Sequence, residues 1–346
     1  MKIYNIATIG TSSIASEFME TVKDISNARL HTVYSRDINK AASVASKYGA
    51  LKYTDSLSDI CEDSEVDAVY IASPNSFHAP QTEMMIGAGK NVFCEKPLFD
   101  NNRTTKRLIE KAKSKGVLLM EAYKTAYMPE MKLISDNISK LGKIRSAFFP
   151  FGKYSSRYDA HLRGENVNTF KNEFSNGGLL DMGIYGIYPS LMLFGEPKSV
   201  MGTASIVDGG VDGVGFVTLG YGDFCTCVHY SKVSNSFLPC EISGENGTMT
   251  IDRINIPKKI EIVYKNGDRE VLLDKSVKAE NMSAALHTFE GMRGETLAFV
   301  KALDDGISDV KPEGSLLTSH EISLAGSRIT DEVRKMIGLS YPSDDL

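Results

Sequence analysis

The stretch that decides the fold is IYNIATIGTSSIASEFMETV, residues 3 to 22. Its first part, Ile3 to Ile9, is an apolar run with the length of a buried strand. Its second part repeats apolar side chains at helical spacing, at residues 14, 15, 18, 19 and 22. Gly10 separates the two patterns. The stretch therefore predicts a strand that turns directly into a helix, which is the first unit of an α/β sheet.

The same alternation continues to residue 122. Further strands are expected at residues 30–34, 51–53, 66–72, 92–94 and 117–122. Helices are expected at 41–48, 57–60 and 104–115, and in a segment with Pro80 in an early turn and Gly89 at its end. Strands that alternate with helices require right-handed crossovers and a parallel sheet. Residues 1–122 are therefore predicted to form a doubly wound, dinucleotide-binding domain.

Beyond residue 122 the pattern changes to short strands separated by turns. One helix is expected near 130–140 and two more at 290–303 and 316–336. Strands are expected at 144–151, 200–206, 214–221, 224–230, 241–243, 248–251 and 260–264. Residues 123–346 are therefore predicted to be an α+β domain with a largely antiparallel open sheet, used for substrate binding and oligomerisation.

Composition narrows the class of partner. The net charge is −5 and the basic residues are spread along the chain, which argues against nucleic acid and against an anionic membrane surface as partners. No apolar stretch approaches the roughly 20 residues of a membrane-spanning helix. The five cysteines form no C-x-x-C pair, which favours reduced thiols, a cytoplasmic location and no metal site. A small-molecule substrate is expected.

The turn after the first strand partly matches a dinucleotide fingerprint. Gly10 fits the tight turn and Ala15 the small packing position, but Ser12 stands where a second glycine is usual. The free N–H groups at the start of the following helix suit a phosphate. An ordinary strand-to-helix turn would show the same residues.

The end of the second strand bears on the choice of cofactor. NAD-binding proteins usually place an acid there for the ribose 2′-hydroxyl, and this chain has Ser35 followed by Arg36. A serine beside an arginine favours NADP, with NAD still possible. Alternatively, Arg36 is a solvated surface residue and Asp37 begins a helix cap.

The segment FCEKPLFD, residues 93 to 100, places Lys96 directly after a buried strand. Ligands of doubly wound sheets bind at this carboxyl edge. A lysine at a strand end can also simply extend to water. Pro97 fixes the local backbone and so gives the preceding side chain a defined direction.

Several motifs together resemble the Gfo/Idh/MocA oxidoreductases, the glucose–fructose oxidoreductase and inositol dehydrogenase family. They are Glu95-Lys96-Pro97, YIASPNSFHAP at 70–80, Ser35-Arg36, MEA at 120–122 and GGLLDMGIY at 177–185. The resemblance implies a Rossmann domain, an open C-terminal sheet and a nicotinamide cofactor at their junction, with Lys96 facing the reacting carbon. It also implies these cofactor-binding positions: Gly10, Ser12, Ser13, Ile14, Ser35, Arg36, Ser73, Pro74, Asn75, His78, Glu95 and Lys96.

Asp181 and Tyr185 are four residues apart, so they share one face if 179–194 is helical. Oxidation of an alcohol requires removal of its hydroxyl proton, and a tyrosine beside an ammonium group has a lowered pKa. With the resemblance, this makes Tyr185 the expected acid/base, Lys96 its tuning partner and Asp181 the residue that orients Lys96 or a substrate hydroxyl. A buried structural tyrosine and a helix-start aspartate are the alternative.

The chain departs from the family pattern near the expected substrate pocket. Inositol dehydrogenase-like members have histidine in place of Tyr185, so the chain is more similar to the sugar and dihydrodiol branch. Ala126 and Met128 stand where that branch has arginine and histidine, and Lys124 offers a charge nearby. Lys124, Tyr158 and Asp181 are the expected substrate-binding residues, although the segment around Tyr158 could equally be an exposed loop.

The resulting hypothesis is an NAD(P)-dependent oxidoreductase that moves hydride between its cofactor and a sugar, polyol or related carbonyl or diol. Two rivals remain: a non-catalytic regulator that senses the cofactor, and an NAD-dependent glycosidase of the same fold. The strands at 214–221 and 225–230 are apolar on both faces, which predicts a homodimer or homotetramer joined through the C-terminal sheet.

Overall fold

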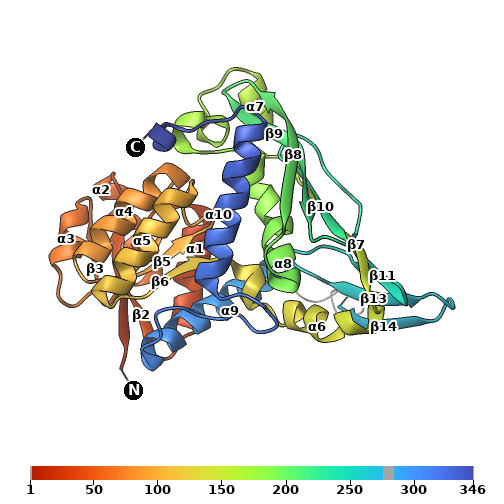
Figure 1. Ribbon diagram of the computed structural model, residues 1–346. Coiled ribbons are helices and arrows are strands. Elements are labelled where there is room, and N and C mark those ends of the chain that lie inside the picture. Colours follow the sequence, from red (N-terminus) through yellow and green to blue (C-terminus); the bar gives the residue numbers. More distant parts are fainter. Residues whose placement is uncertain (1, 276–283, 346) are drawn as a thin grey trace.

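The computed structural model of the protein describes residues 2–275 and 284–345, without the side chains of 284–291. It contains two sheets, one with six strands and one with eight. The strand orders are β3-β2-β1-β4-β5-β6 and β14-β13-β12-β11-β7-β10-β9-β8. Figure 1 shows the two sheets on opposite sides of the long helix α10 (Ser319–Met336).

The first sheet is parallel throughout, which confirms the doubly wound prediction. The strand order reverses between β1 and β4, and ligands of such sheets bind at this switch point. Its strands are β1 (Tyr4–Ile9), β2 (Ala28–Tyr34), β3 (Lys52–Thr54), β4 (Ala68–Ile71), β5 (Asn91–Glu95) and β6 (Leu119–Ala122). Its helices are α1 (Ser13–Lys23), α2 (Ile38–Tyr48), α3 (Leu57–Glu62), α4 (Asn75–Gly87) and α5 (Asn102–Lys115).

Gly10 allows the end of β1 to pack tightly against the end of β4. Its φ is +115°, and a Cβ at this position would lie 2.5 Å from the carbonyl oxygen of Ala72. Only glycine fits such a position. One local prediction in this domain was wrong: α4 already begins at Asn75, so Pro80 lies inside the helix and not in an early turn.

The second sheet is antiparallel except for the pair β7 and β10, which runs parallel. The expected strands are all present, and β14 was missed. The strands are β7 (Ile144–Gly152), β8 (Ser199–Val207), β9 (Val211–Gly220), β10 (Cys225–Ser231), β11 (Cys240–Gly244), β12 (Gly247–Ile251), β13 (Lys259–Tyr264) and β14 (Arg269–Asp274). Shorter elements are the 3-10 turn η1 (Lys124–Tyr127), α6 (Pro129–Asn137), α7 (Tyr158–Leu162) and α8 (Ile184–Phe194).

The two closing helices join the two parts of the molecule. In α9 (Ala284–Asp305), Phe299 stacks on Phe93 of β5 with ring centroids 4.8 Å apart, so this helix completes the core of the first sheet. In α10, Ile329 and Val333 pack in the core of the second sheet. The predicted boundary at residue 122 thus does not separate two independent cores. No helix in the described part of the chain has both the length and the apolar character needed to cross a bilayer.

Candidate active site

A cleft of about 680 Å³ lies where the two sheets meet. The first domain contributes Lys96, from the carboxyl end of β5, and Glu17 of α1. The end of β7, at residues 150–153, and two loops of the second domain, at 235–238 and at 252, 253, 255 and 256, line the other side. Lys124, Asp181, Met182 and Tyr185 complete the lining. The structure therefore brings together all three residues that were predicted to be catalytic.

Lys96 and Asp181 form an ion pair across the cleft. Nζ of Lys96 lies 2.9 Å from Oδ1 of Asp181 and 3.0 Å from its backbone carbonyl oxygen. Burial opposes the charged form of Lys96, but Asp181 and Tyr185 outweigh it and raise the pKa of the ammonium group. The peptide bond between Lys96 and Pro97 is cis. Lys96 is therefore held as a cation at the edge where a cofactor is expected.

Tyr185, the second residue of α8, lies beside this pair. Nζ of Lys96 is 5.0 Å from the centroid of its ring, which packs against Phe151 and Tyr123. Burial raises the pKa of Tyr185 and outweighs the lowering by Lys96. The expectation of a net lowered pKa was therefore wrong, because desolvation is the larger effect. The Tyr185 phenol stays protonated at neutral pH.

The helix predicted for 179–194 begins as a π-helical turn, Leu179–Gly183, and continues as α8. Single π turns inside helices are frequent at functional sites. Asp212 of β9 fixes the start of the turn, because its Oδ2 accepts a hydrogen bond from the Leu179 N–H at 2.6 Å. A Cβ on Gly186 would lie 2.6 Å from Val228 of β10. Glycine there lets α8 lie close to the sheet and so places Tyr185 in the cleft.

Buried acids support the strand ends below Lys96. Oε1 of Glu95 accepts a hydrogen bond from the Tyr70 hydroxyl at 2.5 Å, and burial raises the Glu95 pKa to about 7. Glu121 accepts hydrogen bonds from the Leu98 N–H at 2.8 Å and from the Tyr188 hydroxyl at 2.9 Å. The loop after Lys96 is thus anchored to both β6 and α8.

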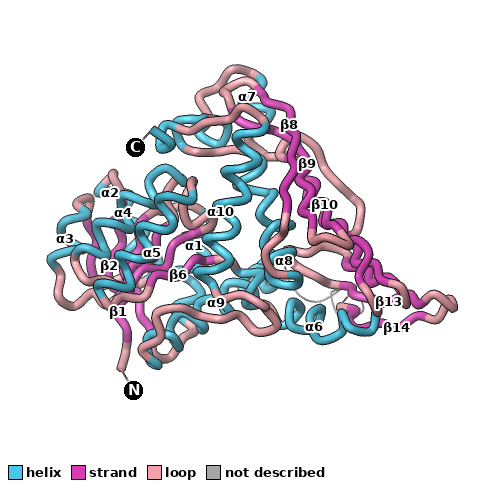
Figure 2. Tube along the Cα trace, in the orientation of Figure 1, coloured by secondary structure: helices cyan, strands magenta, loops and turns pink. Residues whose placement is uncertain are grey.

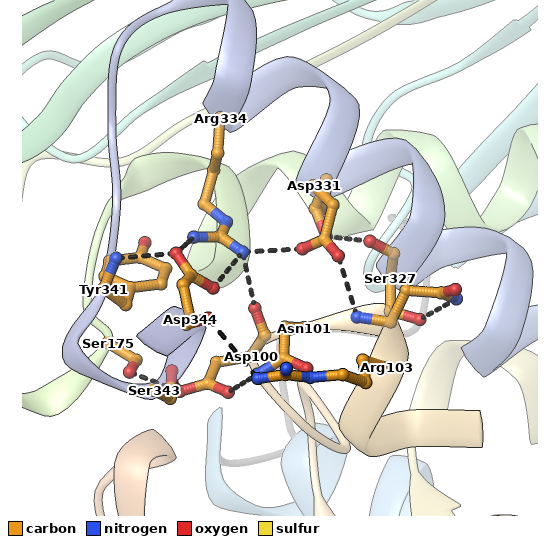
Figure 3. A network of polar contacts seen from close by, with 12 residues as sticks. Asp100, Asn101, Arg103, Ser175, Ser327, Asp331, Arg334, Tyr341, Ser343 and Asp344 are labelled. Atoms are coloured by element: carbon orange, nitrogen blue, oxygen red, sulfur yellow. Dashed lines mark hydrogen bonds and ion pairs between the residues drawn. The ribbon is translucent and has the colours of Figure 1, made fainter. Parts of the chain in front are cut away.

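Figure 3 shows a polar network that ties this loop to the C-terminal segment. The Asp100 carboxylate accepts hydrogen bonds from the hydroxyls of Ser175, at 2.5 Å, and Ser343, at 2.7 Å. The Arg334 guanidinium bonds the Asp100 carbonyl oxygen at 3.2 Å and pairs with Asp344 at 2.6 Å. Because Ser175 precedes the π turn, Asp100 connects the loop carrying Lys96 with the segment carrying Asp181.

The predicted cofactor positions fall into two groups. Gly10, Ser12, Ser13 and Ile14 form the turn and the first residues of α1, where the Ser12 hydroxyl caps the helix by accepting the Ala15 N–H at 3.4 Å. Ser35 and Arg36 follow β2; Arg36 is exposed and has no bonded partner within residues 2–275 and 284–345. Asp37 caps α2, as the alternative interpretation of this segment predicted.

The other predicted cofactor residues hold loops together. Asn75 donates to the Ser175 carbonyl oxygen at 2.9 Å, and the Ser73 hydroxyl donates to Gln81 at 2.7 Å. Both ring nitrogens of His78 lie 2.9 Å from carbonyl oxygens, of Pro97 and Ser73, and the residue is 1% exposed. The ring of His78 is therefore enclosed by protein, and its contact with the cofactor stays a prediction. Pro74 precedes α4 as its N-cap residue.

Of the predicted substrate residues, Lys124 and Asp181 line the cleft and Tyr158 does not. The Tyr158 ring packs in an aromatic cluster at α7, 5.2 Å from Phe170 and 6.0 Å from His161, measured between centroids. Tyr158 begins the small helix α7, and its role in substrate binding stays a prediction.

The sequence interpretation missed Lys232, which lies behind Asp181. Its Nζ is 3.1 Å from Oδ2 of Asp181. The signal was the same as for Lys96, a lysine directly after an apolar strand. It also missed cleft residues from loops of the second sheet, Lys153, Phe237, Arg253 and Asn255, for which a single sequence offers no periodic signal.

Two family models match this chain. The oxidoreductase family with NAD-binding Rossmann fold matches residues 4–123, and the GFO/IDH/MocA C-terminal domain matches 138–250. The chain belongs to the Gfo/Idh/MocA family. The predicted resemblance is thereby confirmed, and with it the prediction of an NAD(P)-dependent oxidoreductase.

Curated relatives align over nearly their whole length. The chain is 38% identical to a scyllo-inositol 2-dehydrogenase (NADP(+)), IolU, of Bacillus subtilis, covering 98% of each chain. It is 29% identical to trans-1,2-dihydrobenzene-1,2-diol dehydrogenase of Mus musculus, covering 97% of each. Among solved structures, a levoglucosan dehydrogenase with NADH and levoglucosan superposes with a TM-score of 0.82 at 18% identity, over 97% of this chain and 98% of that one. KijD10, a 3-ketoreductase from Actinomadura kijaniata with NADP and TDP-benzene, superposes with a TM-score of 0.80 at 21% identity, over 96% and 98%. These two superpositions confirm the fold.

Proposed function

We propose that the protein transfers hydride between NADP and a secondary alcohol carbon of a cyclic polyol or sugar. The observation that carries the proposal is the meeting of Lys96, Asp181 and Tyr185 in one cleft, at the carboxyl edge of a dinucleotide-binding sheet. The NADP-dependent scyllo-inositol dehydrogenase, at 38% identity, supports both the cofactor and the substrate class.

The residues at the switch point fit a dinucleotide. Gly10 makes the tight turn at the end of β1, and the α1 N-terminus begins at Ser13 close to this turn. Free N–H groups at a helix start bind phosphate. Arg36, which has no partner among the described residues, suits a 2′-phosphate, while Ser35 adds no repelling acid. The nicotinamide ring supplies the acceptor or donor of hydride.

The side chains of the cleft supply binding and proton transfer. Lys96 remains charged and stabilises negative charge that develops on the reacting oxygen. Tyr185 remains protonated at neutral pH, so it can donate a proton to that oxygen during reduction of a carbonyl. In the opposite direction the phenolate accepts the hydroxyl proton, and oxidation therefore becomes faster as pH rises.

The lining of the cleft suits a substrate with several hydroxyl groups. Asn255 lines the cleft, and its Oδ1 is buried without a hydrogen-bond partner in the described chain; we infer that a bound substrate hydroxyl donates to it. Lys124 offers a donor, and Phe237, 89% exposed, offers an apolar face on the rim. Buried polar atoms normally have partners, which makes Asn255 a candidate specificity residue.

A substrate screen tests the proposal. Inositols, other polyols, aldoses and dicarbonyls are offered with NADP or NAD, and reduced cofactor is followed by its absorbance. Turnover of at least one cyclic polyol or sugar with NADP is expected. Tight cofactor binding without turnover of any compound would favour the non-catalytic sensor. Release of sugar from glycosides with no net change in cofactor would favour the glycosidase.

The outer face of the second sheet favours a homo-oligomer. Figure 2 shows the helices of the described chain on the inner side of this sheet. On the outer face Met201 is 70% exposed and Phe216 46% exposed. An apolar face of this kind is usually covered in solution, and a second copy is the occupant we propose. Light scattering should give a dimer or tetramer, and M201E/F216D should give a monomer; a monomeric parent protein would exclude the proposal.

The five free cysteines agree with a cytoplasmic location.

A further inference from the structure

Lys232 is a buried cation on the far side of Asp181. It directly follows β10 and is 2% exposed. Its Nζ lies 3.1 Å from Oδ2 of Asp181 and donates to the Thr169 carbonyl oxygen at 3.3 Å. Lys96 meets the other oxygen of the same carboxylate, Oδ1, at 2.9 Å. Asp181 is thus shared between two ammonium groups, one from each domain.

We propose that Lys232 is a positioning residue for the reaction, which holds Asp181 from behind and keeps a net positive charge beside the reacting oxygen. The proposal rests on the function proposed above. It assigns a role in the chemistry to a residue that lies outside the lining of the cleft.

The charges explain why a second lysine matters. Lys96 and Asp181 alone sum to zero, so the carboxylate would cancel most of the field that Lys96 exerts on a substrate. With Lys232 the three side chains sum to +1. Burial opposes ionisation of Asp181, but the charges and hydrogen bonds of Lys96 and Lys232 outweigh it and hold the Asp181 pKa below its ordinary value. Asp181 is therefore charged, and the extra cation is not neutralised within the trio.

Other titratable groups face this trio. Glu95 of β5 acts on both Lys96 and Tyr185, Glu295 of α9 acts on Tyr185, and burial raises the pKa of both carboxyls. The charge of Lys124 interacts with these two acids. Asp212 of β9 interacts with the charge of Lys232. Because burial disfavours the charged forms of the nearby acids, they do not fully cancel the positive charge that Lys232 contributes.

The backbone around Lys232 is fixed independently of its ammonium group. Its N–H donates to the Gly213 carbonyl oxygen, and its own carbonyl accepts from the Ser155 N–H, both at 2.8 Å. Its Nζ lies 5.4 Å from the ring centroid of Phe170. Methionine keeps the length of the side chain and its packing on this ring, so Lys232→Met removes mainly the charge.

The matched control is Lys90→Met. Lys90 is also buried, and its Nζ donates to the carbonyl oxygens of Asp63 and Val66, at 2.6 and 3.0 Å, outside the cleft. Its loss should lower thermal stability without changing the pH profile. If Lys232→Met changes the pH profile and Lys90→Met does not, the change is specific to Lys232 and is not a general effect of losing a buried lysine.

The first test is the pH profile of kcat/KM for oxidation of a substrate that the screen identifies. Lys232→Met should lower turnover by about ten- to a hundredfold and move the alkaline inflection to higher pH, because positive charge that favours the phenolate is lost. Lys232→Arg, which keeps the positive charge, should restore part of the turnover and reverse part of the shift in the inflection. NADP affinity, measured by fluorescence, should not change. A fall in turnover with the inflection unmoved would leave Lys232 a purely structural role and overturn the proposal.

The second test needs neither substrate nor cofactor. The alkaline absorbance change of Tyr185 is isolated by subtracting the titration of Tyr185→Phe, with and without Lys232→Met. Ionisation of Tyr185 should shift to higher pH when Lys232 is lost, and an unchanged titration overturns the proposal. If Lys232→Met does not fold, Lys232→Arg is titrated instead. Because arginine keeps the positive charge, Tyr185 must then ionise at the same pH as in the parent protein. Because this readout needs no turnover, failure of the proposed function is distinguished from failure of the Lys232 assignment.

Discussion

Nζ of Lys96 lies 2.9 Å from Oδ1 of Asp181, although the two residues are 85 positions apart in the chain. One follows the fifth strand of the parallel sheet, and the other belongs to a π turn held against the second sheet. The ion pair therefore exists only when both parts of the molecule are correctly placed. We therefore expect the proposed catalytic constellation to be sensitive to changes in packing outside the cleft.

The Ser35-Arg36 segment should make NADP the preferred cofactor. Arg36→Ala should weaken NADP binding by about tenfold or more, the effect of losing one charge-assisted contact, and leave NAD binding unchanged. Ser35→Asp with Arg36→Ala should reverse the preference. Dissociation constants from fluorescence titration measure both effects. Lys106→Ala, an exposed cation on α5, is the control. Tighter binding of NAD than NADP by the parent protein would show this assignment to be wrong.

Gly186 should be required for the position of α8. In Gly186→Ala the new methyl group would lie 2.6 Å from Val228 and 3.1 Å from Phe149. We expect a loss of about 1–3 kcal/mol in unfolding free energy, the usual cost of overpacking, and lower turnover because Tyr185 is displaced. Urea unfolding and the substrate assay check these effects.

Gly87→Ala is the matched control for Gly186. A Cβ at Gly87 meets nothing within 4 Å, and the residue ends α4 without positive φ. Its substitution should be neutral or stabilise the protein by up to about 1 kcal/mol. Equal effects of the two substitutions would mean that the α8 contact with β10 does not determine the site.

Glu95 should make stability depend on pH. Burial raises its pKa from 4.5 to about 7, so the folded state binds the proton more tightly than the unfolded state. Unfolding free energy then falls as pH rises through this window and levels off above it. Glu95→Gln keeps an oxygen that accepts the Tyr70 hydroxyl but removes the titration. Urea midpoints at about pH 5 and about pH 8 should therefore differ less in the variant than in the parent. An equal fall in the urea midpoint of both proteins between these pH values would show that Glu95 is not the group responsible.

The first domain could be predicted almost completely because each strand and helix there has its own periodic signal. The motif residues also located the cofactor edge and the three cleft residues Lys96, Asp181 and Tyr185. The pKa of Tyr185 could not be predicted, because it depends on how deeply tertiary packing buries the ring. The surroundings of His78 and Tyr158 could not be predicted for the same reason: a motif position fixes a residue's place in the chain, but contacts with distant segments decide which way its side chain faces.

Residues outside the motifs were harder to find. Lys232 resembles Lys96 in sequence context, but only the structure shows that it reaches Asp181. The link from Asp100 to Ser175 and Ser343 joins segments 75 and 243 positions apart, and no single-sequence pattern reports such a contact. The division at residue 122 remains a proposal: the secondary-structure pattern changes there, but α9, from beyond this boundary, packs against the first sheet.

Lys96 and Tyr185 should act as a unit. Lys96→Met and Tyr185→Phe should each lower turnover by at least about a hundredfold, the effect of removing a preorganised charge or a proton-transfer group. The double variant should be little slower than the slower single variant, because coupled catalytic groups are not additive. Effects that multiply would indicate two independent roles.

The most direct test of the central claim is the rate of the hydride step in Lys96→Met, measured as a single turnover with saturating cofactor and substrate. The account predicts a rate at least about a hundredfold below that of the parent protein, with the NADP dissociation constant nearly unchanged. A hydride step of near-normal rate would contradict it, and would leave Lys96 as a cation that only joins the two domains through Asp181.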